Sequence, residues 1–256
     1  MNILMLGDVV GDNGCRFLLE RLPRIRRELK VELTVVNGEN SAEGNGILPS
    51  SARQLWNSGA DVITLGNHGL RRREIYQELA EREELIRPAN YHPSAPGRGF
   101  CIYDRPGLPR TAVVNLSGSC FMDAYRNPFD VMDELLPQLD AKVILVDFHA
   151  EATSEKVAMG MYLDGRVTAV VGTHTHIQTA DERILPGGTG YITDLGMCGS
   201  FNSVLGVRPE LAINRFRTGL PTRFLNDSGP CRMSGVLLSV DHKTGKTTKI
   251  ERVNVE

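Results

Sequence analysis

The sequence has little of what marks several classes of protein. Its five cysteines stand at wide spacings without a C-x-x-C pair, so we expect reduced thiols and neither a disulfide framework nor a sulfur-ligated metal. Its 29 basic and 31 acidic residues leave a formal net charge of −2, which argues against a large nucleic-acid or membrane-binding surface. No apolar run is long enough to span a membrane. These absences predict an ordinary cytoplasmic protein.

The chain also lacks the signs of a targeting segment and of several domains. Its start, "MNILMLGDVVG", has no basic region and no small-residue cleavage site, so we expect no signal peptide. The 256 residues contain no low-complexity tract, no internal repeat and no long linker rich in proline, glycine or serine. That length accommodates one α/β domain or two small ones, and we expect a single domain over residues 1–256.

What recurs along the chain is a short apolar run, then a polar cluster with glycine, then a stretch with helical spacing. The apolar runs, which predict strands, occupy residues 2–7, 33–38, 61–66, 142–148 and 167–173. Pro49 suits the first turn of a helix that Gly59 ends, whereas we expect Pro23 to kink or restart an earlier helix. Strands alternating with helices indicate a parallel sheet covered on both faces.

The C-terminal quarter departs from this pattern. Residues 190–196, 233–240 and 248–255 read as antiparallel strands, the last two joined by the turn "DHKTGK". Residues 198–216 begin irregularly and then become helix-like, which leaves open a substrate-facing loop or a contact in a homo-oligomer. The expected fold is therefore α/β, with stacked mixed β-sheets flanked by helices.

Polar side chains of the kind that bind metals follow five of the predicted strands. In open α/β sheets the ligand site lies beyond the carboxyl ends of the strands, and four of the six histidines fall at such ends. The residues concerned are Asp8, Glu39, Asn40, Asn67, His68, His149, His174 and His176.

Each of these residues also has a purely structural explanation. Asp8 and Asn40 could cap the helices that follow them, and Asn67 could be a turn residue in a left-handed conformation. His149 alone would be a hydrogen-bonded histidine near the surface. Their joint position at the strand ends favours a metal site instead.

The chemistry of this set indicates two metals. Carboxylate, amide and imidazole groups suit iron, manganese, zinc or magnesium, and about seven ligands exceed what one tetrahedral ion needs. Two divalent ions with Asp8, Glu39 and a bridging hydroxide would leave a charge of about +1, so the natural guest is an anion. Paired metals also clamp a phosphoryl group during in-line displacement.

At these residues the sequence resembles the calcineurin-like metallophosphoesterase superfamily, whose motifs are D-x-H, G-D-x-x-D, G-N-H-[DE], a histidine and G-H-x-H. The departures are informative: "GDVVG" lacks the second histidine, "NGEN" places Glu39 at the bridging aspartate, "GNHG" has Gly69 at the acidic position, and "GTHTH" adds a residue. With "NPF", "VDFHAEATSEK" and "TAD" in the same order, they are similar to the bacterial YmdB-like family of 2′,3′-cyclic-nucleotide phosphodiesterases.

The resemblance implies a metallophosphoesterase-type αββα sandwich and a role for each residue. One metal would be held by Asp8, Glu39, Asn40 and His176. Glu39 would bridge to the second, whose other ligands would be Asn67, His149 and His174. His68 would be the catalytic histidine, which protonates the leaving ribose oxygen or steadies the transition state. For Asn40, a helix cap remains an alternative to a ligand.

The resemblance further implies a metal-dependent phosphoric diester hydrolase with two metal ions per chain, iron before manganese, zinc or magnesium. Hydroxide attack would open 2′,3′-cyclic nucleotides to nucleoside 3′-monophosphates. The alternatives are a broader phosphomonoesterase or phosphodiesterase, or a regulatory RNA-processing partner that uses the metal centre as a binding surface. We expect a small-molecule substrate, no membrane and no stable nucleic-acid binding.

Three further features are expected to lie outside the reaction. His92 and His242 stand in a loop and a hairpin and read as surface residues. The basic runs 24–29 and 70–75 read as solvated helix faces, although Arg71 to Arg73 could edge the mouth of the site. Thr153 or Ser154 is expected to cap a helix that positions His149.

Overall fold

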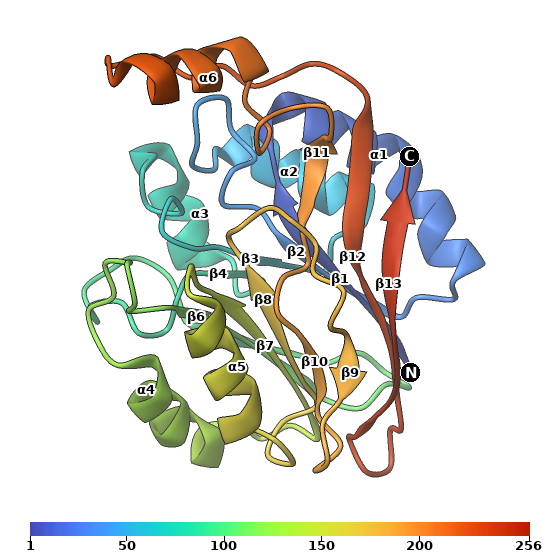
Figure 1. Cartoon of the computed structure of the whole chain (residues 1–256). Coiled ribbons are helices and arrows are strands. Elements are labelled where there is room, and N and C mark those ends of the chain that lie inside the picture. Colours follow the sequence, from blue (N-terminus) through green and yellow to red (C-terminus); the bar gives the residue numbers. More distant parts are fainter.

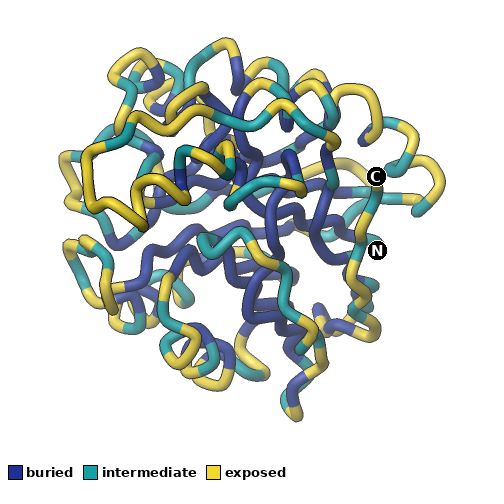
Figure 2. Tube along the Cα trace, turned by 45° about the horizontal axis from the view of Figure 1, so that its top comes forward, coloured by how far each residue is buried: buried dark blue, intermediate teal, exposed yellow.

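The computed structural model describes residues 1–256 and contains two β-sheets packed face to face, with helices on both outer faces (Figure 1). The expected class, α/β with stacked mixed sheets flanked by helices, is confirmed. Buried residues lie along the strands, and exposed residues lie on the outer helices and loops (Figure 2). No helix is both long enough and apolar enough for a membrane crossing.

The first sheet has seven strands in the order β13-β12-β11-β1-β2-β3-β4. Their bounds are β1 Asn2–Val9, β2 Leu33–Asn37, β3 Val62–Thr64, β4 Leu85–Ile86, β11 Met197–Ser200, β12 Cys231–Val240 and β13 Thr247–Val255. Strands β1 to β4 and β11 run parallel, β12 is antiparallel to β1 and β11, and β13 is antiparallel to β12. The predicted C-terminal hairpin is confirmed.

The second sheet has six strands in the order β5-β6-β7-β8-β10-β9. Their bounds are β5 Phe100–Tyr103, β6 Thr111–Ser117, β7 Val143–His149, β8 Ala169–Thr173, β9 Arg183–Ile184 and β10 Gly190–Ile192. Strand β10 runs parallel to β8 and antiparallel only to β9, so the expectation of a purely antiparallel strand there was wrong. The short β9 turns the chain back before β10, which gives β10 the direction of β8.

Six α-helices cover the two sheets. Their bounds are α1 Gly11–Glu28, α2 Pro49–Ser58, α3 Tyr76–Glu81, α4 Pro128–Leu135, α5 Thr153–Tyr162 and α6 Pro209–Thr218. Gly59 ends α2 in a left-handed conformation, as predicted. Helix α6 stands out from the body of the molecule, near the ends of the first sheet (Figure 1).

Three apolar cores bind these layers together, and side-chain alternation along the strands divides residues among them. In β1, Leu4 and Leu6 face α1 to α3, while Ile3 and Met5 face the second sheet. The third core lies between the second sheet and helices α4 and α5. The central core is common to both sheets.

Three local expectations were wrong. Helix α1 runs without interruption through Pro23, and the carbonyl that loses its hydrogen bond there belongs to the exposed Leu19. Residues 197–200 form β11, although glycine and serine predicted irregular structure. Helix α5 has Ala152 at its N-cap with no side-chain cap, so neither Thr153 nor Ser154 caps it.

Candidate metal centre

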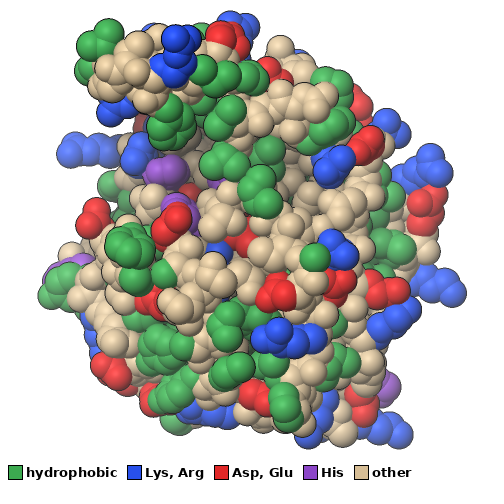
Figure 3. All heavy atoms as spheres, in the orientation of Figure 1, with side chains coloured by type: hydrophobic (Ala, Val, Ile, Leu, Met, Phe, Trp, Pro, Cys, Tyr) green, Lys and Arg blue, Asp and Glu red, His purple; other side chains and the backbone are tan.

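The polar residues predicted from the strand ends gather at one edge of the sandwich, beside the carboxyl ends of β1, β2, β7 and β8. They line a cavity of about 620 Å³, and histidine side chains are visible at its base, below α6 (Figure 3). Glu39, Asn40, His68, His174 and His176 contribute directly to the lining. The sequence argument therefore found the residues of one concave, polar site.

His149 is the buried centre of this group. Its Nε2 atom lies 3.2 Å from Glu39 Oε1, 2.9 Å from Asn67 Oδ1 and 3.1 Å from His174 Nδ1. Its Nδ1 atom lies 2.9 Å from the hydroxyl of Thr173. With a proton on Nδ1, the ring donates a hydrogen bond to that hydroxyl. The Nε2 lone pair then faces the same point as the candidate metal-binding atoms of Glu39, Asn67 and His174.

A buried polar network behind His149 fixes this orientation. The Thr173 hydroxyl donates to Asp147 Oδ1 at 2.7 Å, and the Thr64 hydroxyl donates to Asp147 Oδ2 at 2.5 Å. Burial raises the pKa of Asp147 to about 6. Sequence reasoning missed this network, although a carboxylate inside the apolar strand "VILVDFH" was a visible signal of it. Such outer partners hold a metal-binding imidazole in one tautomer.

The two histidines of "GTHTH" are held in the same manner but present different nitrogens. His174 Nε2 donates to Glu151 Oε2 at 2.9 Å, so its Nδ1 faces the centre. His176 Nδ1 donates to the carbonyl of Leu205 at 3.0 Å, so its Nε2 faces Asp8 and Asn40. Burial and the neighbouring His149 lower the pKa of His174 to about 4, which keeps that ring neutral at pH 7.

The backbone of this loop bends sharply. Both His174 (φ 102°) and His176 (φ 66°) have positive φ, a conformation that costs non-glycine residues free energy and is common at functional sites. Asp194 Oδ2 accepts from the backbone N–H of Thr175 at 3.0 Å, and the same oxygen lies 2.7 Å from the buried Lys156 ammonium. This buried ion pair holds the bend in place.

The carboxylates of the site have no lysine or arginine as a partner. Asp8 and Glu39 are fully buried, yet their ion-pair partners are histidines and include no lysine or arginine. Asp8 Oδ1 has no hydrogen-bond partner at all, whereas Oδ2 accepts from the backbone N–H of His174 at 3.1 Å. An unpaired buried carboxylate oxygen is costly, and burial raises the pKa of Asp8.

Positive charge is favoured at His149, the centre of this cluster. Burial by itself would lower the pKa of His149, but the Glu39 carboxylate outweighs it and raises that pKa to about 9. Donor atoms of Glu39, His149 and His174 lie within 4.8 Å of one another. Atoms that bind one ion at about 2.0–2.2 Å lie roughly 3 Å apart, which matches the contacts around His149 Nε2. The residues present therefore fit a bound cation.

Gly66 leaves the space that these donors occupy. A Cβ atom at this position would lie 2.4 Å from Glu39 Oε2 and 2.3 Å from His149 Cδ2. Any larger residue would displace both side chains. The glycine of "LGNH" is thus required by close approach of the donor groups, whatever its conformational freedom.

His68 and Asn40 lie side by side at the open face of the cluster. His68 Nδ1 is 2.7 Å from Asn40 Oδ1, and its backbone N–H donates to Glu39 Oε2 at 2.9 Å. Asn40 Nδ2 lies 3.1 Å from Glu39 Oε1 and 3.3 Å from His176 Nε2. Burial lowers the pKa of His68 to about 4.

The structural explanations for single residues were wrong, except that Asn67 does lie in a turn. The N-caps of α1 and α2 are Val10 and Leu48, so neither Asp8 nor Asn40 caps a helix. Asn67 has no positive φ, and His149 is buried away from the surface.

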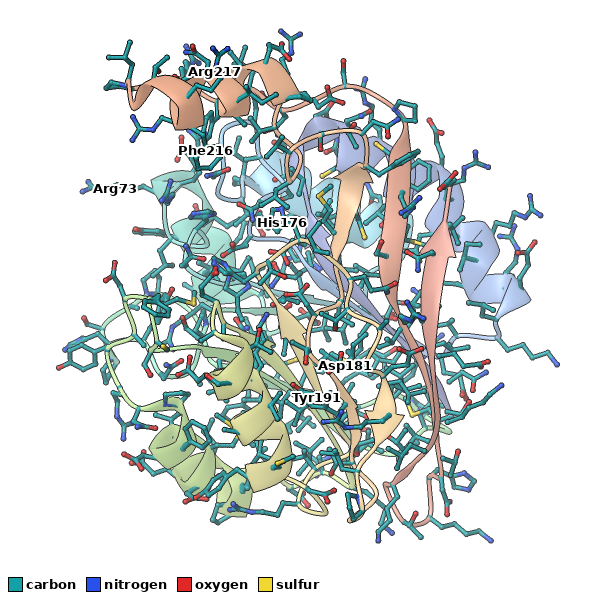
Figure 4. The ribbon with its side chains drawn as sticks, in the orientation of Figure 1. Arg73, His176, Asp181, Tyr191, Phe216 and Arg217 are labelled. Carbon is teal, nitrogen blue, oxygen red and sulfur yellow. The ribbon has the colours of Figure 1, made fainter.

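The two histidines expected at the surface are exposed, and the alternative that Arg71 to Arg73 edge the site holds for Arg72. His92 and His242 are exposed. Arg72 lines the cavity, fixed by hydrogen bonds to the carbonyls of Glu43 and Asn45, while Arg73 points away from the body (Figure 4). Sequence reasoning gave Glu151 no role, although it lies in "VDFHAEATSEK". A substrate-facing loop was left open for residues 198–216, but not for the wall residues 223–226.

Known proteins that are similar to this chain include a phosphodiesterase. The family model described as YmdB-like protein matches residues 4–253. The chain is 46% identical over 255 residues to the 2′,3′-cyclic-nucleotide 2′-phosphodiesterase of Bacillus subtilis, covering 99% of this chain and 96% of that protein.

Two solved structures are also similar over nearly their whole length. A hypothetical protein from Thermus thermophilus is 40% identical with a TM-score of 0.94, covering 100% of this chain and 99% of that one. A structure described as a novel phosphatase from Mycoplasma pneumoniae is 34% identical with a TM-score of 0.93, covering 100% and 93%. Because the family model and these relatives span almost the entire chain, this protein belongs to the YmdB-like family.

Proposed function

We propose that this protein is a metal-dependent phosphodiesterase that opens 2′,3′-cyclic nucleotides to nucleoside 3′-monophosphates. The observation that carries the proposal is the orientation of three histidine rings. In His149, His174 and His176, one ring nitrogen is occupied by a protein acceptor and the other faces the buried carboxylates. The identity of the Bacillus subtilis relative, a cyclic-nucleotide phosphodiesterase by name, supports the choice of substrate.

The donor set divides into two groups that meet at Glu39. Asn67, His149 and His174 would hold one metal, because their donor atoms converge on His149 Nε2. Asp8, Asn40 and His176 would hold the other, since His176 Nε2 lies 3.7 Å from Asp8 Oδ1 and 3.3 Å from the Asn40 amide. His174 and His176 would thus serve different metals. Glu39 is the bridging candidate.

When bound, two divalent ions lower the pKa of a water molecule and polarise the phosphate oxygens. The chain's own residues supply orientation and proton handling. A water oxygen forms a bond to phosphorus, the bond between phosphorus and O2′ breaks, and O2′ takes up a proton. His68 stands at the open face of the donor cluster, where it would hold or deliver that proton.

The orientation of the Asn40 amide affects both metal binding and the position of the proton on His68. In the structure, Asn40 Oδ1 faces His68 and Nδ2 faces His176. A turn of the amide by 180° exchanges these two atoms without changing the shape of the side chain. With the amide turned by 180°, Oδ1 would become a ligand to the metal that Asp8 and His176 would hold. Nδ2 would then donate a hydrogen bond to His68 Nδ1. The proton of neutral His68 would then sit on Nε2, where it can be donated to O2′.

Turnover of 2′,3′-cyclic AMP by chelated and metal-reconstituted protein tests the proposal, with chromatographic identification of the product. We expect adenosine 3′-monophosphate after addition of iron, with manganese, zinc and magnesium as comparisons, and no turnover in chelator. His68→Ala should slow turnover about 10²- to 10⁴-fold at near-normal metal content. His92→Ala, an exposed histidine, is the matched control and should change neither.

Two outcomes would overturn the assignments. If Glu39→Gln retains both metals and full turnover, Glu39 does not bridge. If His68→Ala loses metal, His68 belongs to the ligand set instead.

A broader phosphatase is the second candidate, because the Mycoplasma pneumoniae relative is described as a phosphatase. A metal centre by itself does not separate phosphate monoesters from diesters. Competition between 2′,3′-cyclic AMP, a linear diester and adenosine 3′-monophosphate in one reaction distinguishes them. Preference for the monoester would favour this candidate, whereas accumulation of adenosine 3′-monophosphate would exclude it.

A further inference from the structure

The cavity has two chemically different sides. Seventeen residues line it, and four of them are hydrophobic. All four come from one short stretch of the chain, on either side of α6. They are Leu205, Val207, Phe224 and Leu225. The metal-binding candidates belong to the polar remainder of the lining, so a polar floor meets a single apolar wall.

This wall is fixed beside the polar floor. Val207 forms a β-bridge with Asn226, and the backbone N–H of Arg208 donates to the carbonyl of Leu225 at 3.1 Å. The wall touches the donor cluster directly, because the carbonyl of Leu205 accepts the hydrogen bond from His176. The two segments that flank α6 in the sequence are therefore held against the site, while α6 itself stands out from the body (Figure 4).

The apolar side chains of the wall are left open to solvent. Phe224 is 44% exposed and Leu205 is 43% exposed. Phe224 carries the only phenyl, phenol or indole ring in the lining. Exposed apolar groups grouped inside a polar cavity indicate a place for an apolar part of the ligand. A flat ring offers that part a stacking surface.

The proposed substrate has one part of this kind. In a 2′,3′-cyclic nucleotide the phosphate and the base lie on opposite sides of the ribose, so a phosphate on the polar floor directs the base to the side of the cavity. The cavity volume of about 620 Å³ falls within the about 300–1,000 Å³ of small-molecule sites. Resting on the proposed function, we infer that Phe224 is a specificity residue, on which the nucleobase stacks within a subsite formed by the 205–225 wall.

A substrate without a base separates this subsite from the reaction itself. Phe224→Ala should raise KM for 2′,3′-cyclic AMP about 5- to 150-fold, the range expected for loss of one base–aromatic stack. It should leave kcat/KM for glycerol 1,2-cyclic phosphate and the metal content unchanged. Phe224→Trp should restore KM because it restores the ring.

Phe216→Ala is the matched control. Phe216 belongs to the same segment and is 83% exposed on α6, but it does not line the cavity. Its replacement removes an exposed phenyl ring without removing the stacking surface, so both KM values should stay at the wild-type level. A rise in KM equal to that of Phe224→Ala would overturn the inference.

Direct binding gives a readout that does not depend on turnover. By titration calorimetry on metal-loaded protein, Phe224→Ala should weaken binding of adenosine 3′-monophosphate and leave binding of inorganic phosphate unchanged. Equal loss for both ligands, or for both substrates, would refute the subsite. Absence of cyclic-nucleotide turnover in the wild type would instead refute the proposed function, and the binding comparison would still decide the subsite.

Discussion

The buried ion pair between Lys156 and Asp194 gives the most quantitative prediction. Both side chains are 1% exposed, and the ammonium lies 2.7 Å from the carboxylate. Lys156→Met keeps most of the volume but leaves a buried carboxylate without its cation. Breaking a buried pair in this way costs about 3–5 kcal/mol.

For Lys156→Met, we expect a loss in the free energy of unfolding at the lower end of that range. Asp194 also accepts from the backbone N–H groups of Thr175 and Gly196, at 3.0 and 2.8 Å, so part of its charge remains compensated. We therefore expect a loss of about 3 kcal/mol in the free energy of unfolding. For a chain of this size that loss lowers Tm by about 6–12 °C.

Urea unfolding of metal-free protein measures the effect, and Lys249→Met is the matched control. The Lys249–Glu251 pair has nearly the same distance, 2.8 Å, but its side chains are 62% and 49% exposed. An exposed pair contributes about 0–1 kcal/mol. If Lys156→Met costs no more than Lys249→Met, the buried pair does not stabilise the bend between the two histidines.

Further predictions concern the groups around the donors. Gly66→Ala should abolish metal binding in a folded protein, because the added Cβ would lie 2.4 Å from Glu39 Oε2; elemental analysis with circular dichroism checks both points, and normal metal content would contradict the close approach. Glu151→Ala should weaken metal affinity about 10- to 100-fold, because His174 loses the acceptor that keeps Nδ1 directed inward. Competition with a chelator measures the affinity, and Glu155→Ala serves as control, because Glu155 lies nearby in the first turn of α5 but is hydrogen-bonded to Ser119.

Much of the fold was predictable because the apolar periodicity is regular. The runs at 2–7, 33–38 and 142–148 form strands, because successive side chains along each run pack into two different cores. Residues 197–200 were not predictable, because β11 depends on ladder partners in β1 and β12 that are distant in sequence, those in β1 by almost 200 residues. The direction of β10 likewise depends on the short strand β9.

The candidate site was predictable only as a set of residue types at strand ends. The rule that parallel strands present their carboxyl ends to one site brought Asp8, Glu39 and His149 together. The partners that orient the histidines were not visible, because the contact of Glu151 with His174 and that of the Leu205 carbonyl with His176 join segments distant in sequence. The Asp147 network was also missed, although its position in a buried strand indicated a structural role.

The measurement that tests the central claim most directly is the metal content of the purified protein, with turnover of 2′,3′-cyclic AMP followed in the same samples. We predict two metal ions per chain in the wild type, loss of both metal and turnover in Glu39→Gln, and recovery of the wild type alone after reconstitution. Fewer than two metals per chain, with no hydrolysis after reconstitution, would contradict a two-metal phosphodiesterase.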